Sequence, residues 1–180
     1  MTALDTTALS LLLIPGSPVT RPGTKKLIKH APERLQAFVD RTAQAGESIL
    51  QPTPALSEVF VGVATDKIQK ILVELNASRW FRIEGFDLAA AIELADRTAK
   101  AKAKGDKRDG IRADWTKIKF DRQIMAIAIV NGAADIISND PDLIALGIRW
   151  KFPVLGIEDL PLPAELIPPP LLAQLHEEQE

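Results

Sequence analysis

The spacing of apolar residues alternates between two patterns along the chain, and this alternation predicts the order of its elements. Short apolar runs bounded by Gly, Pro, Asn, Asp or Ser are typical of buried strands. Longer stretches in which apolar residues recur at every third or fourth position are typical of helices that pack one face on a core. Strands are expected at residues 2–4, 48–50, 80–83, 135–138 and 153–157.

Several of the expected helices carry recognisable boundary residues. Thr53 and Asp87 are good N-caps. Pro54 and Pro141 suit the first helical position, where no backbone N–H is needed. Pro32 interrupts one helical pattern because proline lacks that N–H. Helices are expected at residues 8–13, 25–45, 54–63, 65–78, 87–104 and 115–130, and from residue 141 onward.

Strands and helices that alternate in this way predict βαβ units with right-handed crossovers and a parallel sheet covered by helices, which is an α/β fold. A chain of 180 residues is long enough for one domain with a sizeable core. We expect that domain at residues 1–157. Residues 158–180 are expected to form a proline-rich, acidic C-terminal tail, since the chain from Ile157 onward has six acids and no Lys or Arg.

Composition narrows the chemistry that the chain can support. It contains no cysteine and two histidines, which excludes thiolate sites and leaves little material for an imidazole zinc site. Any metal site must therefore use oxygen ligands, which suits Mg²⁺ or Mn²⁺. The apolar run at residues 8–14 is far shorter than the roughly 18 residues of a membrane span and has no basic flank, so a soluble cytoplasmic protein is expected.

Charge is unevenly distributed along the chain. Residues 97–122, here called the basic stretch, contain ten Lys or Arg against four Asp. Such a segment can bind a polyanion, or it can be a solvated lysine-rich helix, and the charge pattern alone leaves both interpretations open. Its basic residues are Arg97, Lys100, Lys102, Lys104, Lys107, Arg108, Arg112, Lys117, Lys119 and Arg122.

Acidic residues follow three of the expected strands or begin the helices after them. Asp5 follows the first strand, Asp140 follows the fourth, and Glu58 lies in the first turns of the helix after the second. Ligands of parallel sheets bind beyond the carboxyl ends of the strands, so these acids are candidates for a site. Each also has a simpler explanation, because Asp is a common N-cap and Glu is favourable near a helix N-terminus.

Asp121 is harder to explain as a structural residue. Its neighbours three, four and seven positions later are apolar, so it lies on or beside the buried face of its helix. An ionised carboxylate rarely points inward without a partner, and no local partner is obvious. Four acids converging at one end of a sheet would raise one another's pKa, and a divalent cation would remove that repulsion.

Four fragments of the sequence resemble those of the PIN-domain nucleases, and among them the VapC-like toxins of type II toxin–antitoxin systems. Each fragment alone is weakly specific, but their order and their expected strand or helix context are more so. The fragments are LDTTAL at residues 4–9, PTPALSEV at 52–59, FDRQIMAIA at 120–128 and ADIISNDPDL at 134–143.

This resemblance implies a three-layer α/β/α fold with a central parallel sheet and a Mg²⁺- or Mn²⁺-dependent endoribonuclease activity. It also implies an RNA substrate, pairing into a homodimer and, for toxin members, a cognate antitoxin protein. By motif match, the metal-binding and catalytic acids are Asp5, Glu58, Asp121 and Asp140, the nearby hydroxyls are Thr6 and Ser138, and Asp142 is a candidate further ligand through water.

The chain is longer than most toxins of this type, and the basic stretch and the proline-rich tail are additions. The basic stretch can hold RNA by its phosphates. We expect those contacts from Lys100, Lys102, Lys104, Lys107, Arg108 and Lys119.

Two alternatives from other classes are a catalytically silent PIN-like module that binds RNA or a protein, and a small-molecule phosphatase. Thr7 argues against the haloacid-dehalogenase type of phosphatase, which has a second Asp two residues after the first.

Overall fold

The computed structural model describes residues 1–167, and residues 168–180 lie outside the described part of the chain. All strand pairs in the central five-stranded sheet are parallel, in the order β3-β2-β1-β4-β5, which confirms the expected α/β class. The strands are β1 (Thr2–Leu4), β2 (Ile49–Pro52), β3 (Phe81–Glu84), β4 (Asp135–Ile137) and β5 (Val154–Leu155).

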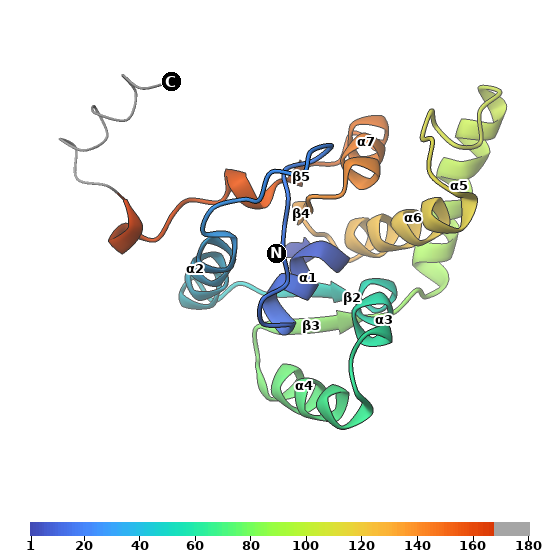
Figure 1. Ribbon diagram of the computed structural model, residues 1–180. Coiled ribbons are helices and arrows are strands. Elements are labelled where there is room, and N and C mark those ends of the chain that lie inside the picture. The colour runs from blue at the N-terminus through green and yellow to red at the C-terminus, as the bar shows by residue number, and fades with distance from the viewer. Residues whose placement is uncertain (168–180) are drawn as a thin grey trace, which may run out of the picture.

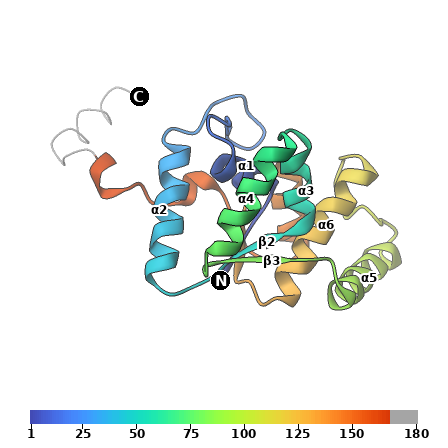
Figure 2. The same ribbon diagram turned by 90° about the horizontal axis from the view of Figure 1, so that it is seen from below.

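Helices occupy the intervals between the strands, and α2 and α5 lie at opposite sides of the molecule in both views (Figures 1 and 2). They are α1 (Thr6–Leu13), α2 (Ala31–Gln44), α3 (Thr53–Val61), α4 (Thr65–Ala77), α5 (Leu88–Ala103), α6 (Trp115–Val130) and α7 (Pro141–Trp150). Two short 3-10 helices follow β5, namely η1 (Ile157–Asp159) and η2 (Ala164–Leu166).

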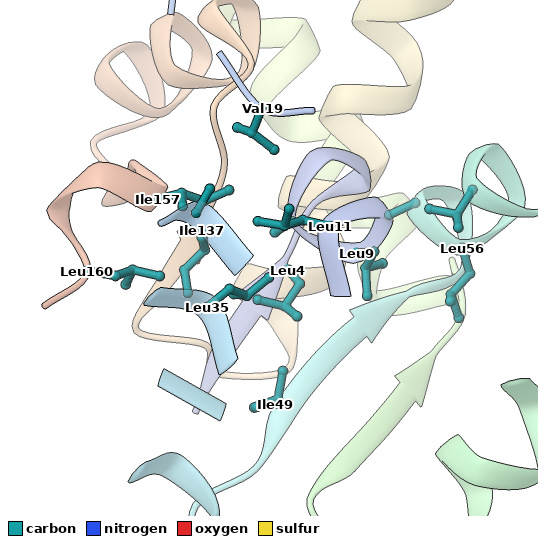
Figure 3. Packing of buried hydrophobic residues seen from close by; sticks show 14 of the residues in the cluster. Leu4, Leu9, Leu11, Val19, Leu35, Ile49, Leu56, Ile137, Ile157 and Leu160 are labelled. Carbon is teal, nitrogen blue, oxygen red and sulfur yellow. The ribbon is translucent and has the colours of Figure 1, made fainter. Parts of the chain in front are cut away.

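Successive strand residues point to opposite faces of the sheet and enter two different hydrophobic clusters. In β1, Leu4 packs in a cluster with α1, α2, α3 and α4, whereas Ala3 packs in a second cluster with α5, α6 and α7. In β4, Ile137 and Ile136 divide in the same way. Figure 3 shows the first cluster, with Leu4 of the sheet close to the α1 side chains. The sheet therefore lies between two layers of helices, as the resemblance implies.

Helix α2 starts later in the sequence than expected. The helix begins at Ala31 rather than at residue 25, because Pro32 fits the first turn of a helix but not its interior. The preceding residues form a loop in which Leu27 makes an isolated bridge with Thr20. A smaller correction applies to α3, where Pro52 rather than Thr53 occupies the N-cap position.

The chain beyond β5 stays in contact with the body through two buried residues. Ile157 and Leu160 join the first cluster, beside Ile137 and Leu35 in Figure 3. Arg34 of α2 donates a hydrogen bond to the carbonyl oxygen of Leu160. The domain boundary expected after residue 157 stays a prediction, and most of the expected tail lies outside the described residues. Within residues 1–167, no helix is both long and apolar enough to span a membrane.

The sheet order creates one place where a ligand site is favoured. The chain builds β1, β2 and β3 outward in one direction, and then places β4 on the other side of β1. The crevice beyond the carboxyl ends of β1 and β4 is therefore a topological switch point, where parallel sheets commonly bind ligands.

Candidate active site

A pocket of about 360 Å³ opens at this switch point, and the structure brings all four predicted acids to its wall. Asp5 follows β1, Asp140 follows β4, Glu58 comes from α3, and Asp121 comes from α6. The four acids are far apart in sequence, so only the fold brings them together. The other lining residues are Thr6, Thr7, Ser10, Ser17, Pro18, Lys117, Ile124 and Leu143.

The buried side chain of Asp5 caps a helix and also lines the pocket. One carboxylate oxygen accepts a hydrogen bond from the backbone N–H of Ala8 at 2.8 Å, which makes Asp5 the N-cap of α1. The other oxygen accepts from the hydroxyls of Ser138 and Thr7. Burial raises the pKa of Asp5 to about 6. The hydrogen bonds lower this pKa, and the nearby charge of Asp140 raises it further.

Asp140 is the N-cap of α7, as its position before Pro141 suggested. Its Oδ1 accepts the backbone N–H of Asp142 at 2.8 Å, and its own backbone N–H donates to the Ser138 hydroxyl at 3.0 Å. Ser138 therefore connects the two acids, because it also donates to Asp5. Capping and a place in the pocket are compatible roles for Asp5 and Asp140.

Glu58 lies at the exposed side of the pocket. It accepts a hydrogen bond from the Thr6 hydroxyl, so the two hydroxyl residues named by the resemblance, Thr6 and Ser138, each contact one of the acids. Glu58 is exposed, whereas Asp5 is only 2% exposed, and the pocket therefore runs from a buried floor to a solvated edge.

Asp121 is the acid with the fewest interactions. It is 8% exposed, and its buried Oδ2 has no hydrogen-bond partner among the described residues. Burial raises the pKa of Asp121 to about 7, with Asp140 adding to the shift and Lys117 opposing it. A buried carboxylate oxygen without a donor is costly for the fold, and it marks the point in the pocket where a cation would be most favourable.

Lys117 lies in the pocket as well, and sequence reasoning counted it only as part of the basic stretch. Its ammonium bonds Asp140 at 2.9 Å and also contacts Asp142. Burial lowers the pKa of Lys117, but the hydrogen bonds to Asp142 and Asp140 outweigh that effect and raise it overall. A usable signal existed, since Lys117 precedes Asp121 by one helical turn and must lie on the same face of α6.

The oxygens of the pocket meet the requirements of a divalent metal ion only in part. Within residues 1–167, no three acidic or histidine side chains are grouped closely enough to form a ready metal-binding set. The oxygens of Asp5 and Asp140 are taken up by protein donors, whereas Oδ2 of Asp121 is not. Oxygen-only ligands and one unsatisfied buried oxygen fit Mg²⁺ or Mn²⁺, provided that other carboxylates turn from their present partners. The metal assignment stays a prediction.

The basic stretch divides into two groups. Four of its ten cations make ion pairs, because Arg97 bonds Glu93, Lys100 bonds Asp96, Lys117 bonds the pocket acids, and Arg122 bonds Asp109. Arg122 is 1% exposed and is a residue of the core. The remaining six make no ion pair with any residue in 1–167, and all are exposed: Lys102, Lys104, Lys107, Arg108, Arg112 and Lys119.

Two of these exposed lysines lie over the ring of Trp115, the first residue of α6. The Nζ atoms of Lys107 and Lys119 lie 4.7 and 5.7 Å from the centre of its ring. Lys119 and Lys117 are two residues apart on the helix, so their side chains leave α6 about 200° apart. The cations around Trp115 and the acid pocket therefore lie on different sides of α6.

No family model matches the chain, and no curated protein matches it in sequence. Among solved structures, 13 chains match, including one from the crystal structure of DNA-bound VapBC from Salmonella typhimurium. The two chains have a TM-score of 0.53 and 14% sequence identity over 87% of this chain and 97% of that one. At this identity the similarity shows a shared fold, which agrees with the three-layer architecture.

Proposed function

We propose that this protein is a metal-dependent endoribonuclease that hydrolyses RNA phosphodiesters in the pocket at the switch point. The observation that carries the proposal is the convergence of Asp5, Glu58, Asp121 and Asp140 in one pocket, with an oxygen of Asp121 buried and unpaired. Four carboxylates brought from four separate elements repel one another, and the single ammonium of Lys117 offsets that repulsion only in part.

These four acids would hold one or two Mg²⁺ or Mn²⁺ ions, with Asp142 available through a water. The chemistry that such an ion would supply is the activation of a water for in-line attack and the stabilisation of the leaving oxygen. Asp121 contributes a negative oxygen at the buried end of the pocket. Ser138 and Thr6 hold Asp5 and Glu58 at the pocket through their hydroxyl hydrogen bonds, and these carboxylates would exchange part of those contacts for the ion.

The RNA would be bound outside the pocket by the unpaired exposed cations of the basic stretch, and it would have to extend around α6 to reach both. Lys102, Lys104, Lys107, Arg108 and Lys119 lack an ionic partner within residues 1–167, so phosphate contacts would cost no existing ion pair. Lys100 is also exposed, but Asp96 already neutralises part of its charge. Such contacts hold the backbone and carry little sequence information.

The biological context we propose is that of a VapC-like toxin. Its fold is similar to that of a chain in a VapBC structure, and four fragments of its sequence resemble those of VapC-like toxins. A cognate antitoxin and a homodimer are the partners that this assignment implies.

A second candidate is a catalytically silent module that binds RNA or a protein. The observation that favours it is the position of Lys117, whose ammonium forms ion pairs with both Asp140 and Asp142. In that case Lys117 would be the permanent counter-ion of Asp140 and Asp142, and the exposed cations would carry the function.

Cleavage of a mixed RNA pool that includes tRNA separates the two candidates. Purified protein is incubated with Mg²⁺, with Mn²⁺ or with EDTA, beside the Asp5→Ala variant, and the products are mapped at their ends. We expect cleavage that requires metal and is lost in the variant. RNA binding without cleavage in either metal, and without metal binding by calorimetry, would favour the silent module.

A further inference from the structure

Lys117 and the acids of α7 form an ionic contact that no family resemblance assigns. Lys117 lies in the first turn of α6 and reaches the first turn of α7, 23 residues further along the chain. Its ammonium bonds both Asp140 and Asp142. These are a predicted ligand and a candidate further ligand of the metal ion, so the ammonium occupies carboxylate oxygens that a divalent cation would use.

The contact is only partly buried. The side chain of Lys117 is 39% exposed, and those of Asp140 and Asp142 are 25% and 29% exposed. A lysine has a flexible stem of four carbons, so its ammonium can move into solvent without a change in the backbone. The core pair of Arg122 with Asp109 is different, because the arginine there is 1% exposed. Lys117 is therefore able to leave its partners, whereas Arg122 is held in place.

Lys117 does not satisfy every oxygen of the pocket. Asp121 lies one turn along the same helix, and its Oδ2 has no hydrogen-bond partner among the described residues. The ammonium thus reduces the repulsion between the acids while leaving one buried oxygen free for a second cation. A divalent ion carries twice the charge of the ammonium and would compete with it for Asp140.

We propose that Lys117 is a built-in counter-ion that competes with the divalent metal for Asp140 and Asp142 and thereby sets the metal affinity of the pocket. This inference rests on the proposed metal-dependent function. Without metal, Lys117 stabilises the acid pocket. With metal, it is displaced toward the pocket mouth. It is a positioning residue, because it acts on the carboxylates.

Calorimetric titration of the full chain with Mn²⁺, in the absence of RNA, tests this role. Lys117→Met keeps most of the side-chain volume and removes the charge, and it should bind Mn²⁺ about tenfold more tightly than the wild type, since a competing cation at contact distance is gone. Lys117→Arg keeps the charge and should bind close to wild-type affinity. Lys119→Met is the matched control, because it removes a lysine that points to Trp115 instead of the pocket.

Thermal melting gives a second readout, and its measurement in EDTA does not depend on metal affinity. In EDTA, Lys117→Met should melt below the wild type because the acids lose their counter-ion, and saturating Mn²⁺ should raise its melting temperature more than that of the wild type. This pattern is unlike that of a merely misfolded variant, which would lose stability in both conditions.

Equal Mn²⁺ affinity in Lys117→Met and Lys119→Met would overturn the inference while leaving the nuclease proposal intact. Weaker binding in Lys117→Met would overturn it too, because Lys117 would then support the ligands. If no variant bound Mn²⁺, the metal site and the inference would both fall. If the affinities differed as expected but RNA stayed uncut by the wild type, the inference would stand and the nuclease proposal would fail.

Discussion

The acid pocket and the basic stretch are both concentrations of charge, but they are organised in opposite ways. The pocket collects acids from four elements, and two of them, Asp5 and Asp121, are almost fully buried. The basic stretch is continuous in sequence and mostly exposed, and four of its ten cations are already paired. The pocket therefore maintains a charge imbalance inside the protein, whereas the charge of the stretch is partly neutralised, mostly by acids outside residues 97–122.

The difference shows where a charge carries information about function. A buried, unpaired charge is expensive, so its presence requires a reason beyond solubility. An exposed lysine costs little and is explained equally well as a solvated residue or as a phosphate contact. The pocket is consequently the stronger argument for chemistry, and the stretch supports substrate binding only through its unpaired members.

The largest expected effect comes from the pocket. Asp121→Asn keeps the shape of the side chain but removes its charge, and we expect RNA cleavage to fall by at least about a hundredfold, the scale on which single electrostatic groups act. Its melting temperature in EDTA should stay equal or rise, because a buried charge without a partner is lost. Asp114→Asn, an exposed acid near the start of the same helix, is the control. Full activity in Asp121→Asn would remove this residue from the site.

The second-largest expected effect is a loss of stability in Arg122→Ala, which tests whether Arg122 belongs to the core and not to an RNA-binding face. Its guanidinium bonds Asp109 at 2.8 Å and the carbonyl oxygen of Lys107 at 2.7 Å. Arg122→Ala leaves Asp109 without its charged partner and should lower the free energy of unfolding by about 3 kcal/mol in urea titrations. Arg112→Ala, an exposed control, should change it by less than about 0.5 kcal/mol. Similar values for the two variants would place Arg122 among the dispensable surface cations.

A smaller effect separates paired from unpaired lysines. Replacing Lys102, Lys104 and Lys107 together with Gln should weaken RNA binding and reduce the slope of log affinity against log salt by about 0.7 per lost single-strand contact. Lys100→Gln should change the slope less than Lys102→Gln, because Asp96 partly neutralises Lys100. Fluorescence anisotropy with labelled RNA over a salt series measures both. An unchanged slope in the triple variant would make the stretch a solvated surface.

The smallest expected effect is a pH dependence within the basic stretch. Backbone N–H groups of Arg108 and Gly110 donate to Asp106 and lower the pKa of its carboxyl below the ordinary value of 3.8. A carboxyl with a depressed folded pKa adds stability above its unfolded pKa and loses it as the pH falls through the folded value, here below about pH 4. NMR titration of the Asp106 carboxyl should give a midpoint under 3.8, and a midpoint at or above it would contradict the loop geometry.

The fold was largely predictable because its signals are local. Apolar runs, N-caps such as Asp87 and Asp140, and the alternation of strand with helix identified the elements and the parallel sheet. The predicted start of α2 at residue 25 was wrong because the apolar spacing continues before Pro32. The helix begins at Ala31, since proline fits the first turn of a helix but not its interior. The same locality explains why β5 was expected to be longer than Val154–Leu155, since pairing with β4 sets its length.

The candidate site was predictable in its acids but not in its cations. Asp5 and Asp140 were visible because they follow strands, and Asp121 was visible because it interrupts an apolar face. Lys117 looked like one more member of a charged segment, and so did Arg122. Their roles depend on Asp140 and Asp109, which lie on other elements.

The sequence by itself determined the α/β class, the order of the elements and the identities of the acids that line the pocket. Tertiary structure alone decided that Lys117 faces those acids, that Arg122 is buried with Asp109, and that Lys102 and its exposed neighbours remain unpaired within residues 1–167. The physical reason is the range of the interactions. Caps and hydrophobic periodicity act over a few residues, whereas a long charged side chain takes its partner from whichever segment the fold brings within reach.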